Sequence, residues 1–131
     1  MPIWLAAGSV QLEKKIYRTV FSALFPEKKV LKVWVDDEKR RAFFAELGGG
    51  VRLVEEPDRA DALILKKDRT ITLDKPVIAE RYTILKHYAK NAVAGFYWKK
   101  GRPHLLFVKP ALERYHMRLP QDMQRYIVKK P

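Results

Sequence analysis

Two adjacent carboxylates, Asp36 and Asp37, follow directly after an apolar run of strand length. Open α/β sheets usually bind ligands beyond the carboxyl ends of their strands, and a carboxylate pair there could hold Mg²⁺. The simpler role is to cap the helix that follows, which needs only one of the two. A metal site of the phosphoacceptor type also needs an acidic residue after the third strand, where the chain has Lys66 and Lys67. We therefore predict a helix cap, no metal, and a crevice in which these four residues contact an acidic ligand or partner.

No other set of residues indicates catalysis. The three histidines, His87, His104 and His116, have no second His or Cys at metal-ligand spacing beside them. Neither serine lies in a Gly-x-Ser-x-Gly motif. The three glycines at 48–50 lack the Lys-Ser/Thr ending of a phosphate-binding loop and read as a turn. We expect a protein that is not an enzyme, with no catalytic residue and no cofactor.

A second candidate site is basic. Lys99, Lys100 and Arg102 stand at an expected hairpin tip beside Tyr97 and Trp98. Basic β-ribbons can enter a nucleic-acid groove, and aromatic rings can stack on bases. Arg114 and Arg118 would add further contacts to a polyanion. A solvated turn is the simpler interpretation, because turns are often charged, and both readings stay open.

The element that must position this tip is a hairpin within residues 92–110. Two apolar and aromatic runs flank a short break that contains Gly101, which is typical of a β-hairpin. Phe96 and Trp98 would share one face of the first strand, with Tyr97 on the other. Apolar side chains on both faces predict that the hairpin lies inside a covered sheet and not at its edge.

Hydrophobic spacing and turn signals predict the remaining elements. Apolar residues recur every four positions, at Leu12, Ile16, Val20 and Leu24, and predict a helix that Pro26 ends. The other elements follow in the same way. We expect helices at 11–25, 38–47, 81–90 and 110–115, a last short helix from 119–120, strands at 30–35, 51–54, 62–65 and 77–79, a turn at 67–69 and an extended piece at 70–73. This order predicts a single α/β domain over residues 10–131, with a central sheet flanked by helices and completed by the hairpin.

The charge is unevenly distributed along the 131 residues. The chain has 27 Lys and Arg against 15 Asp and Glu, a formal net charge of +12. Residues 81–131 hold 12 basic and 2 acidic side chains, so a net charge of +10 belongs to the C-terminal part. This field favours a polyanion, whether nucleic acid, anionic lipid or an acidic protein. The chain has no cysteine, and its single asparagine among many Lys, Arg and Glu residues is typical of heat-adapted proteins.

Residues 1–9, MPIWLAAGS, resemble the last part of a signal peptide. An apolar segment is followed by the small residues that a signal peptidase needs, although no basic segment precedes it. An ordinary N-terminal strand and a remnant of cloning are the alternatives. No apolar stretch is long enough for a membrane-spanning helix.

The order and spacing of several segments resemble the YfiR-like family of small exported α/β regulators. The resembling segments are Leu24-Phe25-Pro26, Val33-Trp34-Val35-Asp36-Asp37, Ala60 to Leu65, Ala92 to Phe96, Gly101-Arg102, Leu105 to Val108 and Met117 to Pro120. The resemblance implies a non-enzymatic periplasmic regulator that acts through protein contacts, such as the periplasmic domain of a membrane diguanylate cyclase, and that forms homodimers. The cysteines that such repressors can use for redox control are absent here. The alternative is a cytoplasmic nucleic-acid-binding protein.

Overall fold

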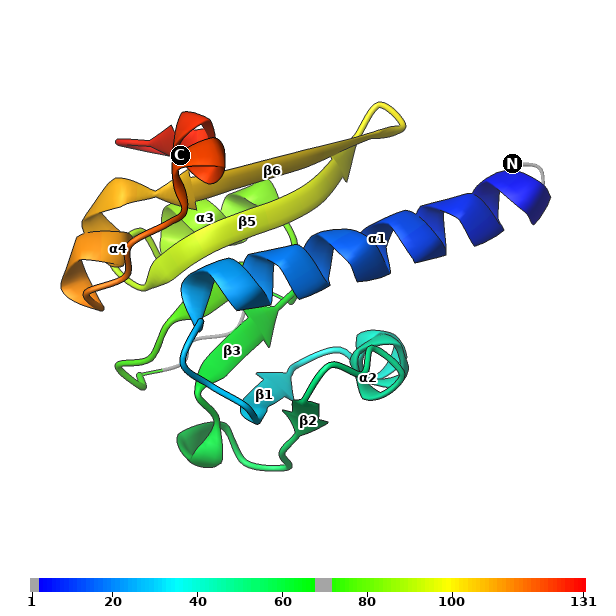
Figure 1. Ribbon diagram of the computed structural model, residues 1–131, viewed down its shortest axis with the longest axis horizontal. Helices are drawn as coiled ribbons and strands as arrows, with labels where there is room; N and C mark the ends of the chain where they lie inside the picture. Colours follow the sequence, from blue (N-terminus) through cyan, green and yellow to red (C-terminus); the bar gives the residue numbers. More distant parts are fainter. Residues whose placement is uncertain (1–2, 68–71) are drawn as a thin grey trace.

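The computed structural model describes residues 3–67 and 72–131, and it contains one seven-stranded sheet. The strand order is β2-β1-β3-β4-β5-β6-β7, and the strands from β2 to β5 are parallel. β6 runs antiparallel to β5, and β7 runs parallel to β6 (Figure 1). The strands are β1 Leu31–Val35, β2 Val51–Leu53, β3 Ala62–Leu65, β4 Val77–Ala79, β5 Ala92–Lys99, β6 Arg102–Val108 and β7 Ile127–Val128. The predicted α/β class is therefore confirmed.

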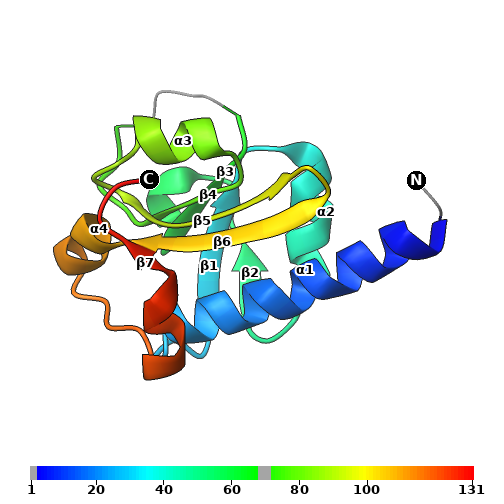
Figure 2. The same ribbon diagram turned by 90° about the horizontal axis from the view of Figure 1, so that it is seen from above.

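Helices cover both faces of this sheet (Figure 2). The helices are α1 Ile3–Leu24, α2 Glu38–Ala45, α3 Tyr82–His87 and α4 Lys109–Arg114, with two 3₁₀ helices, η1 Pro57–Arg59 and η2 Gln121–Tyr126. The ring of Tyr17 from α1 packs edge-on against Phe44 of α2 and Phe96 of β5. Leu85 of α3 packs against the neighbouring Gly95. Because successive strand residues point to opposite faces, α1 and α3 lie on opposite sides of the sheet.

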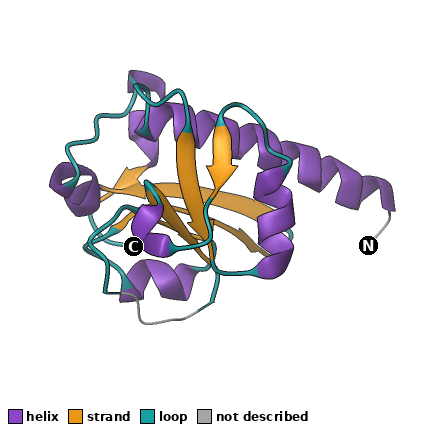
Figure 3. Ribbon diagram, turned by 90° about the horizontal axis from the view of Figure 1, so that it is seen from below, coloured by secondary structure: helices purple, strands orange, loops and turns teal. Residues whose placement is uncertain are grey.

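The long helix α1 differs from its prediction in where it starts and in which face is buried. It begins at Ile3 and not at Gln11, and it continues without a break past residue 9. Leu12, which we predicted on the buried stripe, is exposed. The buried residues are Tyr17, Val20, Phe21, Ala23 and Leu24. The buried face is rotated because the aromatic rings of Tyr17 and Phe21 pack into the core, and only the C-terminal half of α1 crosses the sheet (Figure 3).

The hairpin formed by β5 and β6 has the predicted strands and turn, but its place in the sheet differs. β5 is covered, whereas β7 pairs only with Phe107 and Val108 of β6. The outer part of β6, from Arg102 to Leu106, has no further strand beside it among the described residues. The expectation of a fully covered hairpin was therefore wrong for β6. The short strand β7 that follows η2 was not predicted.

Most other elements begin and end within a few residues of their predicted positions. The helix predicted at 38–47 ends at Ala45, and both Phe44 and Leu47 are buried. Ile84 and Leu85 form the buried side of α3. The predicted extended piece at 70–73 and turn at 67–69 fall mostly outside the described residues. No described helix has the length and apolar character needed to cross a membrane.

Candidate functional site

The residues at the carboxyl ends of β1, β3 and β4 meet at one edge of the sheet because these strands are parallel. Asp36 follows β1, Lys66 follows β3 and Glu80 follows β4. β2 lies on one side of β1 and β3 on the other, so the chain changes direction across the sheet at this point. Such a switch point leaves a crevice in which open α/β sheets bind ligands.

Asp36 has a structural role at this edge. Its side chain is buried, and its two carboxylate oxygens accept hydrogen bonds from the backbone amides of Lys66 at 2.9 Å and Lys67 at 2.8 Å. These bonds hold the start of the loop after β3 against the end of β1. Hydrogen bonds to a charged acceptor are stronger than neutral ones, and here they occupy both oxygens. Asp36 is therefore not available to a ligand.

Asp37 is the N-cap of α2, as the sequence predicted for one of the two carboxylates. Its backbone is extended, and its carboxylate accepts a hydrogen bond from the amide of Arg40 at 3.2 Å. The ammonium group of Lys67 lies 3.9 Å from the other carboxylate oxygen. Across residues 3–67 and 72–131, no group of three or more His, Asp or Glu side chains is arranged to hold a metal ion.

Two adjoining hollows open at this edge of the sheet. Most of the charged side chains that line them and form no ion pair with a described residue are basic. The larger, of about 540 Å³, is lined by five basic residues, Lys39, Arg41, Lys66, Lys67 and Arg81, and by three acidic ones, Asp36, Asp37 and Glu38. The smaller, of about 260 Å³, lies between Lys66, Arg81 and the aromatic side chains of the hairpin. Within the described part of the chain, Lys39, Lys66 and Arg81 form no ion pair. Lys66 and Arg81 border both hollows, so together with Lys39 in the larger hollow they offer cationic groups to a ligand.

A buried polar cluster that the sequence analysis missed forms the wall of the smaller hollow. Arg40 binds Glu80 through Nε at 2.9 Å and through a terminal nitrogen at 2.7 Å, and its other terminal nitrogen binds Glu13 at 3.1 Å. The hydroxyl of Tyr17 donates to Glu80, and the indole of Trp98 donates to Glu13. The cluster therefore joins α1, α2, β4 and β5.

The environment of this cluster shifts the pKa values of Tyr17 and Arg40. Burial raises the pKa of the Tyr17 hydroxyl, and the charge of Glu80 raises it further. Burial acts to lower the pKa of Arg40, but its bonds to Glu80 outweigh that effect and raise the pKa above its usual range. Both side chains therefore keep their protons at all ordinary pH values. The sequence carries little signal for this cluster, because Glu13 and Arg40 lie in charged stretches and only Glu80 directly follows an apolar run.

The basic side chains singled out from the sequence do not form one surface. Lys99, Lys100 and Arg102 are exposed at the hairpin tip. Arg114 and Arg118 lie near α4, at the other end of the hairpin (Figure 1). Arg114 is also paired with Asp74 at 3.0 Å. The structure thus separates the three tip residues from the other two.

The aromatic residues beside the tip have mixed surroundings. Trp98 is 39% exposed, so it is not a core residue, and its indole nitrogen lies 2.6 Å from Glu13. Tyr97 is partly buried and stacks on the cross-strand partner His104, with ring centroids 5.3 Å apart. Neither ring is fully free to stack on a base.

Comparisons with protein families and with curated proteins add no function to this geometry. No protein-family model matches the chain, and no curated protein matches it. The resemblance to YfiR-like regulators therefore stays a prediction.

Proposed function

We propose that this protein is a non-enzymatic binding module that recognises an anionic group at the carboxyl edge of its parallel strands. The proposal rests on one observation: at that edge the aspartate carboxylates already have partners, whereas, within the described structure, two basic side chains do not. The carboxylates of Asp36 and Asp37 are held by backbone amides, whereas Lys66 and Arg81 have no acidic partner among the described residues. The edge therefore offers positive charge to a ligand.

The bound group is a small acidic molecule or an acidic surface of a partner protein. Both would supply oxygen anions, which Arg and Lys bind by charge-assisted hydrogen bonds. The formal net charge of +12 also attracts anions from a distance and speeds their association. The resemblance to YfiR-like proteins adds a periplasmic location and a signalling partner to this proposal. In that setting the module acts by occupancy of the edge, with no catalytic step.

The proposal is tested by adding inorganic pyrophosphate to the protein at low salt. Binding is measured by NMR, as changes in the chemical shifts of the backbone amides. We expect the largest shifts at Lys66, Lys67 and Arg81. The double variant Lys66→Gln/Arg81→Gln should weaken binding at least tenfold, since each lost charge-assisted bond contributes about 1.5 kcal/mol or more. The control Lys129→Gln/Lys130→Gln removes the same charge at the far C-terminus and should change binding little. Equal weakening by both double variants would show that only net charge matters, and the proposal would be rejected.

Nucleic-acid binding at the hairpin tip is a second candidate, favoured by the exposure of Lys99, Lys100 and Arg102. Contacts from these three side chains to three phosphates predict a log-log salt slope of about −3 on duplex DNA. The triple variant Lys99→Gln/Lys100→Gln/Arg102→Gln should remove the salt dependence of DNA binding and leave pyrophosphate binding unchanged. A wild-type protein with no measurable DNA affinity at low salt would remove this candidate.

A further inference from the structure

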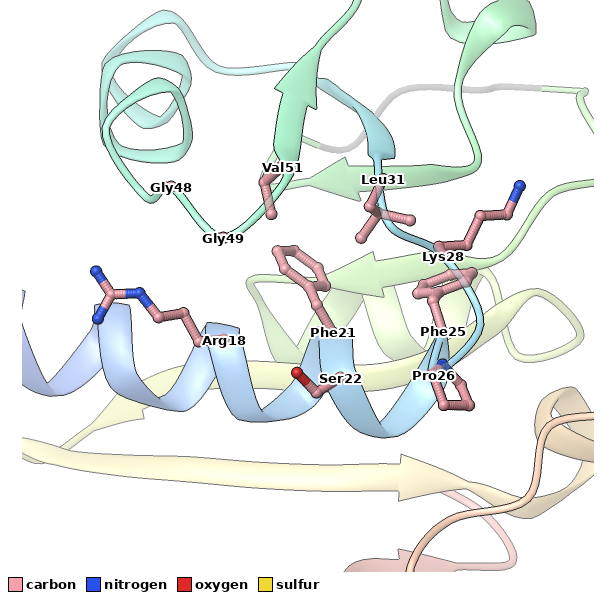
Figure 4. Close-up of a pocket in the computed structure, with 10 residues that line it drawn as sticks. All are labelled: Arg18, Phe21, Ser22, Phe25, Pro26, Lys28, Leu31, Gly48, Gly49 and Val51. Atoms are coloured by element: carbon pink, nitrogen blue, oxygen red, sulfur yellow. The ribbon is translucent and has the colours of Figure 1, made fainter.

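A separate cavity of about 360 Å³ lies at the opposite edge of the sheet, where β1 and β2 begin. Its floor is the C-terminal half of α1, and its roof is the turn between α2 and β2 that contains Gly48 and Gly49 (Figure 4). Leu31 and Val51, the first residues of β1 and β2, close it on the sheet side. The cavity is thus remote from the anion-binding edge proposed above.

The lining of this cavity is partly apolar and partly polar, with Arg18, Ser22 and Lys28 on its polar part. Phe21, Phe25, Leu31 and Val51 direct their side chains toward one another across it (Figure 4). Phe21 and Leu31 are 5% and 4% exposed, so they form its base, while Phe25 and Val51 are only partly buried. A hollow that combines apolar side chains with a few polar groups can orient a small molecule that has an apolar body and a polar end.

One unneutralised charge borders the apolar part of the lining. The Nε of Arg18 donates to the carbonyl of Leu47 at 3.2 Å, which leaves its two terminal nitrogens without a partner among the described residues. Lys28, the other basic residue of the lining, is paired with Asp61 at 3.1 Å. No acidic side chain lines the cavity. The bond to Leu47 holds the guanidinium beside the Gly48 turn.

The turn contributes no side chain to the cavity at Gly48 and Gly49. A Cβ added at either position would meet no atom within 4 Å. Arg18 lies on α1, and Phe25 directly follows Leu24, the last residue of this helix, so the two are separated by about 10 Å along the helix axis. A ligand that spans the cavity therefore has a charged end and an apolar body of about that length.

We infer that this cavity binds an apolar monocarboxylate, such as a medium-chain fatty acid. The carboxylate binds the free terminal nitrogens of Arg18, whose planar arrangement matches two carboxylate oxygens. The apolar chain lies over Phe21 and reaches toward Phe25 and Leu31. This inference does not depend on the proposed anion-binding edge, because it uses none of the same residues.

Octanoate, kept below the concentration at which it forms micelles, and uncharged octanol are the probes. We expect octanoate to shift the amide signals of Gly48, Gly49 and Val51, and to bind about tenfold more tightly than octanol because of the Arg18 contact. In Arg18→Gln the two probes should bind alike. Val51→Phe should weaken both, because a larger side chain fills the cavity.

Arg52→Gln is the matched control. Arg52 follows Val51 in β2, carries the same charge as Arg18, and is exposed. It should leave octanoate binding unchanged, as should Lys66→Gln/Arg81→Gln. The inference is overturned if wild-type protein binds octanoate and octanol equally, if the shifts lie away from the α2–β2 turn, or if Arg52→Gln weakens octanoate as much as Arg18→Gln.

Discussion

The hydroxyl of Tyr17, in the middle of α1, donates a hydrogen bond to the carboxylate of Glu80 at the end of β4. Both residues are buried, and they are 63 positions apart in the chain. Arg40 of α2 supplies the positive charge that this buried carboxylate requires. The guanidinium also lies 4.2 Å from the ring centroid of Phe43. Two helices are thereby held against the edge that carries the proposed anion site.

Arg40→Met should destabilise the protein strongly. The substitution leaves the Glu80 carboxylate buried without its cation, which typically costs about 3–5 kcal/mol. Urea unfolding at neutral pH measures the loss. The double variant Arg40→Met/Glu80→Gln should recover much of it, because no unpaired buried charge remains. Lys39→Met, at the exposed neighbouring position, is the control and should change stability little. A similar loss in both single variants would contradict the assigned role of the cluster.

Asp36→Asn and Asp37→Asn should differ although they make the same change at adjacent positions. The amide of Asn offers one acceptor oxygen, so at position 36 it can satisfy only one of the two backbone amides, at an expected cost of about 2 kcal/mol. At position 37 Asn caps a helix about as well as Asp, and stability should be nearly unchanged. Chemical denaturation of the two variants tests this difference. Equal losses would mean that Asp36 does not hold the Lys66-Lys67 segment.

Asp61 should make stability depend on acidic pH. Partial burial raises the pKa of its carboxyl, but the hydrogen bonds from the Lys32 amide and the Lys28 ammonium outweigh that effect and lower the pKa. Because the folded-state pKa is lower than the unfolded value of about 3.9, the stabilisation is complete above that value. It is lost as the pH falls through the folded-state pKa.

The pH prediction is measured as the free energy of unfolding between about pH 5 and pH 2. Asp61→Asn should be less stable than wild type at the upper end of this range, and the two curves should converge at the lower end. Asp58→Asn, at a nearby exposed position, should leave the wild-type curve in place. If the difference between wild type and Asp61→Asn stayed constant with pH, the carboxylate bonds would not be responsible.

The hairpin turn should be sensitive to substitution at Gly101. Gly101 has a φ of 75°, and Lys100 before it has a φ of 51°, so both turn residues are in the left-handed region. Gly101→Val should lower stability by about 1–2 kcal/mol because a Cβ disfavours this conformation. Lys100→Gly should relieve the same strain and raise the melting temperature. An unchanged melting temperature for Gly101→Val would contradict the turn geometry.

Local elements could be predicted from the sequence because their signals are local. The β-branched run before Asp36 predicted β1, Asp37 was in the expected position to cap α2, and the break at Gly101 predicted the hairpin. The limits of α1 were less accurate. Its apolar spacing included exposed Leu12, and it omitted Tyr17, whose burial depends on rings from other elements.

By itself, the sequence determined the α/β class, most of the strands and helices, and the place of Asp36, Asp37, Lys66 and Lys67 after their strands. Only the tertiary structure decided what those residues do. Asp36 is 30 residues from the amide of Lys66 that it binds, and Arg40 is 40 residues from Glu80. No short-range pattern encodes such pairs, because they arise when parallel strands bring their carboxyl ends together. Lys66 and Arg81 can be recognised as unpaired cations among the described residues only once the structure shows which groups the carboxylates of Asp36 and Asp37 bind.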